Sequence, residues 1–418
     1  SGVEPEERLK WLIAPVEPEV FQAKHWEQQP LLVARDDPSY YSSIFSIAEF
    51  KELLDSEALT FEKDIDITSY KDGKRETHNG TGVAAPKLTW SMFEDKGCSL
   101  RLLCPQAHST RISTMLAQLE AHWGMFTGSN MYLTPAGTQG FAPHYDDIEA
   151  FVLQLEGSKH WRVYAPRNMD ETLPRFSSGN FVQEEIGEPI LEAVLNPGDL
   201  LYFPRGFIHQ ADSVPGKHSL HITVSTGLHN NWFDFLQLLL PAALGAAASE
   251  DPSFRMTLPR DYLSYMGVVH APPEEASDEE EEHFVSVVMG FLDRIVANLP
   301  FDATADQMAR QFMHQRLPPA LTPEDKVLAT ASFQWADDEG SQLDPDSLLR
   351  VTKPGAARLT VENGRAVLYH PYNNSLRFME DDESRLEFHL AFAPILEALL
   401  TTYPAWLALS DLPLDTED

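Results

Sequence analysis

The sequence predicts a mainly β core, either a sandwich or a double-sheet barrel of the cupin sort, followed by a helical region and a C-terminal module. Two observations support this fold class. Before residue 230 the chain contains many short apolar strands separated by Gly/Pro turns, which is typical of packed sheets. At Asn230 the pattern changes to apolar helices. We therefore expect three domains in the 418 residues, at 1–230, 231–304 and 305–418.

The predicted strands of the core are short and are bounded by turn residues. A tight hairpin is expected over 150–164, turned at the Glu-Gly-Ser of 156–158. The polar loop 73–82 is expected to be flexible, and its basic residues either contact a substrate or are merely solvated. The remaining strands are expected at 99–103, at 130–134, twice within 192–210, and at 218–227.

Two helices of this first domain have recognisable ends. In the segment 46–57, Ser46 is a suitable N-cap and Glu49 follows three residues later, as in a capping box. The segment 112–124 has an amphipathic pattern that stops at Gly124. Both segments are therefore predicted to be helices that cover the β core.

The region 231–304 is predicted to be helical and to form a homodimer. Its apolar faces exceed what one helical insert can bury against itself, and we expect a second copy to cover them. The acidic segment 272–283 is expected to be a solvated linker. No apolar run approaches the length of a membrane span, so we expect no membrane contact. The residues assigned to the dimer face are Phe235, Leu238, Leu239, Phe291 and Ile295.

The C-terminal region 305–418 is predicted to resemble a winged helix. Helices are expected at 304–322 and 384–404, with a hairpin between them that turns at the Glu-Asn-Gly of 362–364. From 306 to 418 there are 9 Lys and Arg against 19 Asp and Glu, a net charge of −10. This charge repels phosphate backbones, so we expect protein contacts and no direct binding of nucleic acid.

Composition limits the partners and the compartment. The net charge of −33 favours a basic protein partner, although solubility alone also explains it. Cys98 and Cys104 match no disulfide or metal-ligand pattern, so we expect two buried free thiols and a reducing, intracellular compartment. The chain begins Ser-Gly without Met, which is typical of a cleavage scar, and natural N-terminal sequence is therefore expected upstream.

The strongest chemical motif is His144-Tyr145-Asp146. In an extended strand, residues i and i+2 face the same side, so His144 and Asp146 would point into one space. His209 lies on another predicted strand and offers a second imidazole. Two His and one carboxylate are the facial triad that binds iron(II) and leaves positions open for other ligands. His-x-Asp alone is common by chance, and the flanking residues give the motif its weight.

The long motifs around this trio resemble the JmjC-domain ribosomal oxygenases, of the nucleolar kind described as a histidyl-hydroxylase and lysine demethylase. The motifs are SLRLLCPQ, GSNMYLTPAGTQGFAPHYDDIEAFVLQLEG and NPGDLLYFPRGFIHQ. The resemblance covers essentially the whole chain. It implies a double-stranded β-helix catalytic core of the JmjC type, a helical dimerisation region and a C-terminal winged helix, in the nucleus or nucleolus.

The resemblance also implies a ligand set for the site. His144, Asp146 and His209 would hold Fe(II), which 2-oxoglutarate chelates and which leaves one position for dioxygen. The distal carboxylate of 2-oxoglutarate would pair with Lys159, because a buried lysine is costly without a partner. The remaining implied residues are Asn130 and Ser225 for the co-substrate and Arg101 and Tyr132 for the substrate. For His108, His122, His160, His218 and His221 we expect a surface or core position.

The expected function is hydroxylation of a histidine in a large-subunit ribosomal protein. Histone lysine demethylation with the same site is the alternative substrate, and an aromatic cage would favour it. A different class is a catalytically weak cupin-like scaffold that binds chromatin or protein through its C-terminal module. The intact triad and Lys159 argue against that class. A zinc-dependent cupin hydrolase or isomerase is a third option, but it gives Lys159 no role.

Overall fold

The fold was taken from a computed structural model, which describes residues 5–270, 279–329 and 344–413. Contacts divide the chain into two compact units. One unit contains 1–229 together with 312–418, and the other contains 230–311. The division into three domains with the expected boundaries remains a prediction.

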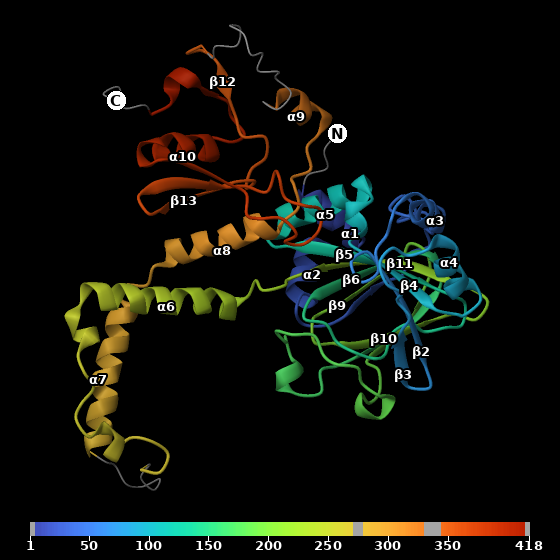
Figure 1. Cartoon of the computed structure of the whole chain (residues 1–418), viewed down its shortest axis with the longest axis horizontal. Helices are drawn as coiled ribbons and strands as arrows, with labels where there is room; N and C mark the ends of the chain where they lie inside the picture. The colour runs from blue at the N-terminus through green and yellow to red at the C-terminus, as the bar shows by residue number, and fades with distance from the viewer. Residues whose placement is uncertain (1–4, 271–278, 330–343, 414–418) are drawn as a thin grey trace. The chain divides into compact units, whose positions relative to one another are not determined.

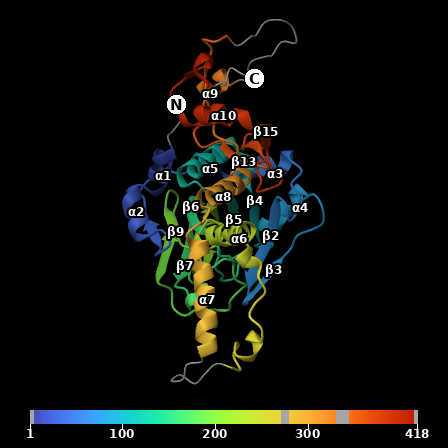
Figure 2. The same ribbon diagram turned by 90° about the vertical axis from the view of Figure 1, so that its left-hand side faces the viewer.

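The N-terminal part of the first unit is built on two antiparallel sheets (Figure 1). Figure 2 shows β9 and β3 on opposite sides of the core, as the strand order requires. The larger sheet contains, in spatial order, β1 (Leu31–Val33), β9 (Leu200–Phe203), β6 (Glu149–Gly157), β11 (Ser219–Thr226), β5 (Thr127–Thr134), β4 (Ser99–Leu103), β2 (Ile65–Lys71) and β3 (Lys74–Thr77). The smaller sheet contains β10 (Ile208–Ser213), β7 (Lys159–Tyr164) and β8 (Leu191–Leu195).

Alternation along β6 shows how the two layers are held together. Phe151 and Leu153 pack into the main hydrophobic core, which also includes side chains of the N-terminal helices. Ala150 and Val152 point the other way and pack against Trp161 of the smaller sheet. Successive side chains of a β-strand point to opposite faces, so a strand that is buried on both faces needs apolar residues at consecutive positions. The helices of this part are α1 (Pro5–Ile13), α2 (Pro18–Lys24), α3 (Ile47–Ser56), α4 (Pro86–Glu94) and α5 (Thr110–Trp123).

The two predicted helix ends are confirmed. The hydroxyl of Ser46 accepts a hydrogen bond from the backbone N–H of Glu49 at 3.2 Å, so it caps α3. Gly124 ends α5 with φ of 67°, a left-handed conformation that glycine adopts without a Cβ clash. Local interactions of these two residues therefore set the two helix ends.

The predicted hairpin over 150–164 is wrong. β6 and β7 do not pair with each other: β6 lies between β9 and β11, and β7 lies between β10 and β8. The chain instead crosses from the larger sheet to the smaller one at Gly157, whose φ is 64°. A Cβ at Gly157 would overlap the carbonyl oxygen of His218, so only glycine fits this crossing.

Two further predictions about local structure are corrected. The segment 73–82 was expected to be a flexible loop, but Lys74–Thr77 form β3, an edge strand that pairs with β2. The segment 384–404 was expected to be helical throughout, but it begins with the strand β15 (Arg385–His389) and becomes α10 (Ala393–Thr401) only later. In both cases pairing with a neighbouring strand overrides local composition.

The C-terminal part of the first unit contains the predicted hairpin. β13 (Arg358–Glu362) pairs with β14 (Arg365–Tyr369), and Asn363 and Gly364 both have positive φ, as a two-residue Asn-Gly turn requires. β14 also pairs with β15. The other elements of this part are α9 (Pro323–Leu328), β12 (Leu348–Leu349) and β16 (Leu407–Ala408), and α8 (Phe301–Gln315) leads into it.

A buried carboxylate joins α5 to the C-terminal part of the same unit. Glu120 accepts hydrogen bonds from the backbone N–H groups of Thr127, at 3.1 Å, and Leu317, at 2.8 Å. Burial raises the pKa of Glu120 to about 8, against the opposing charge of Arg316 and these two donors. Nearby, Arg377 pairs with Asp64 at 2.8 Å. Polar contacts therefore fix the C-terminal part on the β core.

We expect Glu120→Ala to lower the free energy of unfolding by several kcal/mol. Each buried N–H left without an acceptor costs about 1–3 kcal/mol, and the variant leaves two of them. Urea unfolding followed by circular dichroism measures the change. Glu52→Ala is the matched control, because Glu52 is exposed on α3. Equal stability of the two variants would show that Glu120 does not join the two parts.

The second unit, 230–311, is helical. α6 (Trp232–Glu250) and α7 (Glu279–Val296) are its long helices. Glu279–Glu282, expected in a linker, form the first turn of α7, and 271–278 lie outside the described residues. By length and composition alone, the 19-residue α6 could cross a membrane, and so could α7 together with α8 if that bent pair formed one span. The sequence prediction considered only uninterrupted apolar runs, and α6 reaches this length as a helix that Gln237, Pro241 and Gly245 interrupt.

Candidate metal and co-substrate site

A cavity of about 340 Å³ opens between the two sheets. β5 and β11 of the larger sheet and β7 and β10 of the smaller sheet supply side chains to it. Since β-strands alternate their side chains, β5, β7 and β11 present every second residue to the cavity, whereas β10 lines it with the consecutive residues 209–211. The candidate site is built from these inward-facing residues and from the loop that precedes β6.

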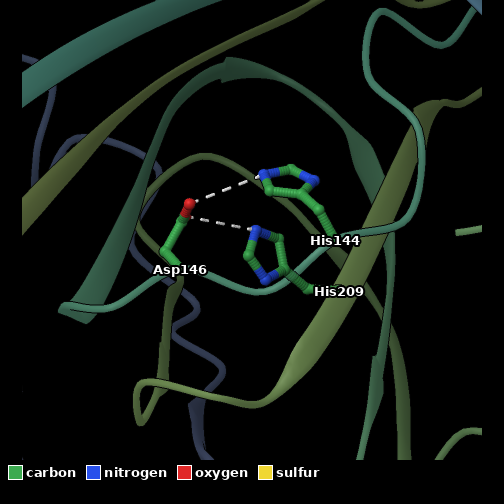
Figure 3. Close-up of side chains that lie close together, drawn as sticks. All are labelled: His144, Asp146 and His209. Atoms are coloured by element: carbon green, nitrogen blue, oxygen red, sulfur yellow. Dashed lines mark ion pairs between the residues drawn. The ribbon is translucent and has the colours of Figure 1, made fainter. Parts of the chain in front are cut away.

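His144, Asp146 and His209 come together at this cavity (Figure 3). His144 and His209 form an isolated β-bridge, with backbone N–H to O distances of 3.3 Å and 2.8 Å in the two directions. Their Nε2 atoms lie 3.8 Å and 3.7 Å from the two carboxylate oxygens of Asp146. These distances exceed a hydrogen bond. The three ligand atoms therefore face a common point and do not bond to one another.

Each histidine ring is oriented by the backbone carbonyl group of the residue two positions before it. Nδ1 of His144 lies 2.8 Å from the carbonyl oxygen of Ala142, and Nδ1 of His209 lies 3.1 Å from that of Phe207. If each Nδ1 carries the proton, each Nε2 presents a lone pair. Burial, together with His144 beside it, lowers the pKa of His209 to about 4, which keeps this ring neutral. The donor set fits Fe(II).

The loop before β10 is held against the metal-binding segment. The N–H of Gly206 donates to the carbonyl oxygen of Asp146 at 3.0 Å. Gly206 has φ of 86°, and a Cβ there would overlap the carbonyl oxygen of Glu171. The Pro-Arg-Gly turn therefore fixes the start of the strand that carries His209 relative to Asp146.

Lys159 is a buried cation in the same cavity. Its side chain is 5 % exposed, and its Nζ donates to the Thr134 hydroxyl at 3.2 Å. Within the described residues, no carboxylate lies within ion-pair distance of it. Burial lowers its pKa to about 7, although Asp212 opposes this change. A carboxylate brought by a ligand would supply the missing partner.

The other residues implied by the resemblance also line the cavity. Asn130 and Tyr132 reach it from β5, and Ser225 reaches it from β11. Arg101 lines it from β4, and its guanidinium is already paired with Asp66 through Nε at 3.0 Å and through a second, shorter bond. The structure thus places all eight predicted site residues around one cavity. Their individual roles remain proposals.

His221 departs from its predicted position among satisfied histidines. It lines the cavity from β11, and its ring stacks on Tyr132 with centroids 4.9 Å apart. Its Nδ1 is buried and has no hydrogen-bond partner among the described residues. The signal was present in the sequence, because His221, Thr223 and Ser225 occupy one face of the alternating strand 218–227.

The other four histidines lie outside the cavity lining. His108 pairs with Glu57 at 2.6 Å, and His160 pairs with Glu192 at 2.8 Å. His122 is on α5, and His218 precedes β11. Phe141 and Trp161 also line the cavity and were not singled out from the sequence. Arg75 lines it too, and it is one of the basic residues of 73–82 for which contact with a substrate was one of two expectations.

Comparison with known proteins gives two domain matches. A JmjC domain model matches residues 101–232, which include the triad. The model of the ribosomal oxygenase 1 C-terminal winged helix domain matches residues 317–418.

Relatives match along almost the whole chain. Ribosomal oxygenase 1 of Gallus gallus is 48% identical over 415 residues, which cover 98% of this chain and 68% of the relative. A bifunctional lysine-specific demethylase and histidyl-hydroxylase NO66 of Aedes aegypti is 41% identical over 415 residues, covering 98% and 65%. Among solved structures, the Escherichia coli ribosomal oxygenase YcfD is 17% identical with a TM-score of 0.47, covering 95% of this chain and 91% of that one.

Proposed function

We propose a function for this chain on the basis of its family. The chain belongs to the ribosomal oxygenase 1 family of JmjC-domain proteins. Proteins of this kind are 2-oxoglutarate-dependent dioxygenases that use Fe(II). The finer proposal is that this chain hydroxylates a histidine of a large-subunit ribosomal protein. The observation that carries it is Lys159, a buried cation without a carboxylate partner among the described residues, in the cavity of the triad.

Each residue has a proposed task in this reaction. Fe(II) would be held by His144, Asp146 and His209. These three ligands leave the other iron positions to the co-substrate and dioxygen. Lys159 pairs with the distal carboxylate of 2-oxoglutarate, and Asn130 and Ser225 complete the co-substrate pocket. When bound, Fe(II) and 2-oxoglutarate supply the activation of dioxygen. One oxygen atom enters the histidine as a hydroxyl, and the other enters succinate, which forms as 2-oxoglutarate loses carbon dioxide.

The contacts of two aromatic rings, Phe141 and Tyr132, argue against their use as a cage for a methylated lysine. Recognition of methyl-ammonium uses open aromatic faces. In this cavity the ring of Phe141 is contacted by the guanidinium groups of Arg75, at 4.6 Å, and Arg101, at 5.6 Å. The ring of Tyr132 is stacked on His221. Both rings are therefore engaged by protein groups.

The test incubates the protein with Fe(II), 2-oxoglutarate and three peptides. One peptide comes from a large-subunit ribosomal protein and contains one histidine, the second is its His→Ala version, and the third is a trimethyl-lysine histone peptide. We expect the first peptide alone to gain one oxygen atom, located on the histidine by fragmentation. Loss of a methyl group from the histone peptide, with no oxidised histidine, would favour the demethylase. No change in any peptide would favour the scaffold.

The homodimer is proposed on two apolar stripes of the helical unit. The residues assigned to the dimer face from sequence are buried or half-buried in the single chain; they are Phe235, Leu238, Leu239, Phe291 and Ile295. The exposed stripes instead have i, i+3, i+7, i+11 spacing, which follows one helix face. They are Phe233, Leu236, Leu240 and Leu244 on α6 and Val285, Val288, Leu292 and Val296 on α7, each between 39% and 62% exposed.

We expect Leu240→Asp to convert the dimer into a monomer, because a charge in an apolar interface must be desolvated without a partner. Light scattering at micromolar concentration measures the mass. Ala242→Asp is the control, because Ala242 is exposed on α6 and lies on the side of the helix opposite the stripe. A monomeric wild-type chain would refute the dimer. Flotation of the wild-type chain with phosphatidylcholine vesicles would show that a membrane covers α6 instead.

The nuclear or nucleolar location, the chromatin role and the absence of direct nucleic-acid contact remain predictions. Each rests on the resemblance or on the charge of the sequence. The basic substrate is supported by the net charge of −33, which would attract such a peptide over about 8 Å at physiological salt.

A further inference from the structure

Arg75 supplies an unpaired guanidinium to the cavity. It lies on the edge strand β3, is half-buried, and lines the cavity. Its Nε is buried and has no hydrogen-bond partner among the described residues. Across 5–270, 279–329 and 344–413, no carboxylate pairs with its side chain. A buried charged donor without an acceptor is unfavourable, and a ligand in the cavity would supply one.

The charges around the cavity leave Arg75 without a task in the reaction. The charged lining residues are Arg75, Arg101, Lys159 and Asp146, besides the histidines. The proposed function assigns Asp146 to the iron and Lys159 to the co-substrate. Arg101 is neutralised by Asp66. The whole chain has a net charge of −33. Its cavity nevertheless keeps one positive charge without a negative partner, which is the charge of Arg75.

Local structure holds this guanidinium in place. It stacks on the ring of Phe141, 4.6 Å from the centroid. The backbone of Arg75 pairs with Tyr70 across the β2–β3 hairpin, and the N–H of Tyr70 donates to the carbonyl oxygen of Gln139 at 2.9 Å. The hairpin is thus fixed to the loop that carries Phe141. Arg75 is held ready before any ligand binds, which lowers the entropy cost of binding.

We propose that Arg75 is a substrate-recognition residue, whose guanidinium donates hydrogen bonds to an oxygen acceptor of the bound peptide. The acceptor is either a main-chain carbonyl or an Asp/Glu carboxylate near the target residue, since guanidinium binds both. This inference rests on the proposed function, because it places a peptide across the cavity mouth. It requires no change at the iron or at the co-substrate.

The test compares Arg75→Gln and Arg75→Lys with Lys74→Gln. Lys74 is the matched control, because it is exposed on the same strand and pairs with Glu76 at 2.6 Å. We expect Arg75→Gln to raise the peptide KM by about tenfold to a hundredfold, the range of a charge-assisted hydrogen bond. The KM for 2-oxoglutarate, and succinate formation without peptide, should not change. Arg75→Lys should recover part of the loss, and Lys74→Gln should match the wild type.

Peptide variants then identify the acceptor. Each Asp or Glu of the peptide is replaced by Asn or Gln in turn. If one replacement raises the wild-type KM and removes the effect of Arg75→Gln, the acceptor is that carboxylate. If the effect persists in every peptide, the acceptor is a main-chain carbonyl.

Other results would overturn the inference. An unchanged peptide KM in Arg75→Gln would mean that Arg75 does not contact the peptide. A rise in the 2-oxoglutarate KM alone would place Arg75 on the co-substrate. If the wild-type chain forms succinate but modifies no peptide, the proposed function fails first, and the role of Arg75 fails with it.

Discussion

His144→Ala and Asp146→Ala should each abolish succinate formation while the chain remains folded. Groups that only orient a metal ligand are worth about 10–100-fold in affinity or activity, so the loss of a ligand itself should exceed about a hundredfold. The fold should survive, because both residues lie in the loop before β6, and neither belongs to the hydrophobic core. Succinate is measured with saturating Fe(II) and 2-oxoglutarate, and thermal unfolding is followed by circular dichroism.

Metal binding gives this prediction a readout besides activity. Calorimetric titration with Mn(II), a stand-in for Fe(II), should show binding in the wild type and none in the two variants. His160→Ala is the control, because it removes an imidazole from β7 that pairs with Glu192 outside the cavity. A folded His144→Ala variant that forms succinate at the wild-type rate would show that the triad does not hold the iron.

Lys159→Met should raise the KM for 2-oxoglutarate by about tenfold to a hundredfold, because it removes a charge-assisted contact with the distal carboxylate. Methionine keeps most of the side-chain volume, so packing is preserved. The maximal rate at saturating 2-oxoglutarate should change much less, since the triad is intact. Lys217→Met is the control, because Lys217 is exposed in the loop before β11. An unchanged KM in Lys159→Met would remove Lys159 from the co-substrate pocket.

The pH dependence of this KM provides a second measurement. The pKa of Lys159 is lowered to about 7 by burial, and the carboxylate of 2-oxoglutarate binds the charged ammonium. The wild-type KM should therefore be lowest below pH 7 and should rise as the pH increases above it. The Lys159→Met variant should lack this rise. A wild-type KM that is constant from pH 6 to about 9 would contradict the assignment.

The parts of the fold that depend on neighbouring residues were predictable, and the parts that depend on distant pairing were not. Ser46 and Gly124 mark helix ends by their own chemistry. The Glu-Gly-Ser at 156–158 marks a turn equally well, but nothing local shows that the next strand joins the other sheet. For the same reason 73–82 appeared to be a loop, since β3 exists only through its pairing with β2.

The candidate site shows the same division. His144 and Asp146 are two residues apart, so the sequence predicted that they converge, although the structure places them in the loop before β6 and not on a strand face. Arg75 lies far from them in the chain and reaches the cavity only through the β2–β3 hairpin. In α6, apolar residues occupy nearly every face, so the sequence alone could not tell the buried Leu239 from the exposed Leu240.

The crossing at Gly157 has a consequence for the choice of co-substrate. The iron end of a bound keto acid would be held by Asp146 in the loop before β6 and by His209 on β10, and its distal carboxylate by Lys159 at the start of β7, the strand that follows β6. The one glycine between these strands tolerates no Cβ, and the chain cannot lengthen or slip there without disturbing the contact with His218. The site therefore holds the iron ligands and Lys159 at a fixed separation. We expect it to accept the five-carbon 2-oxoglutarate and to discriminate against oxaloacetate, which is one carbon shorter, and 2-oxoadipate, which is one carbon longer.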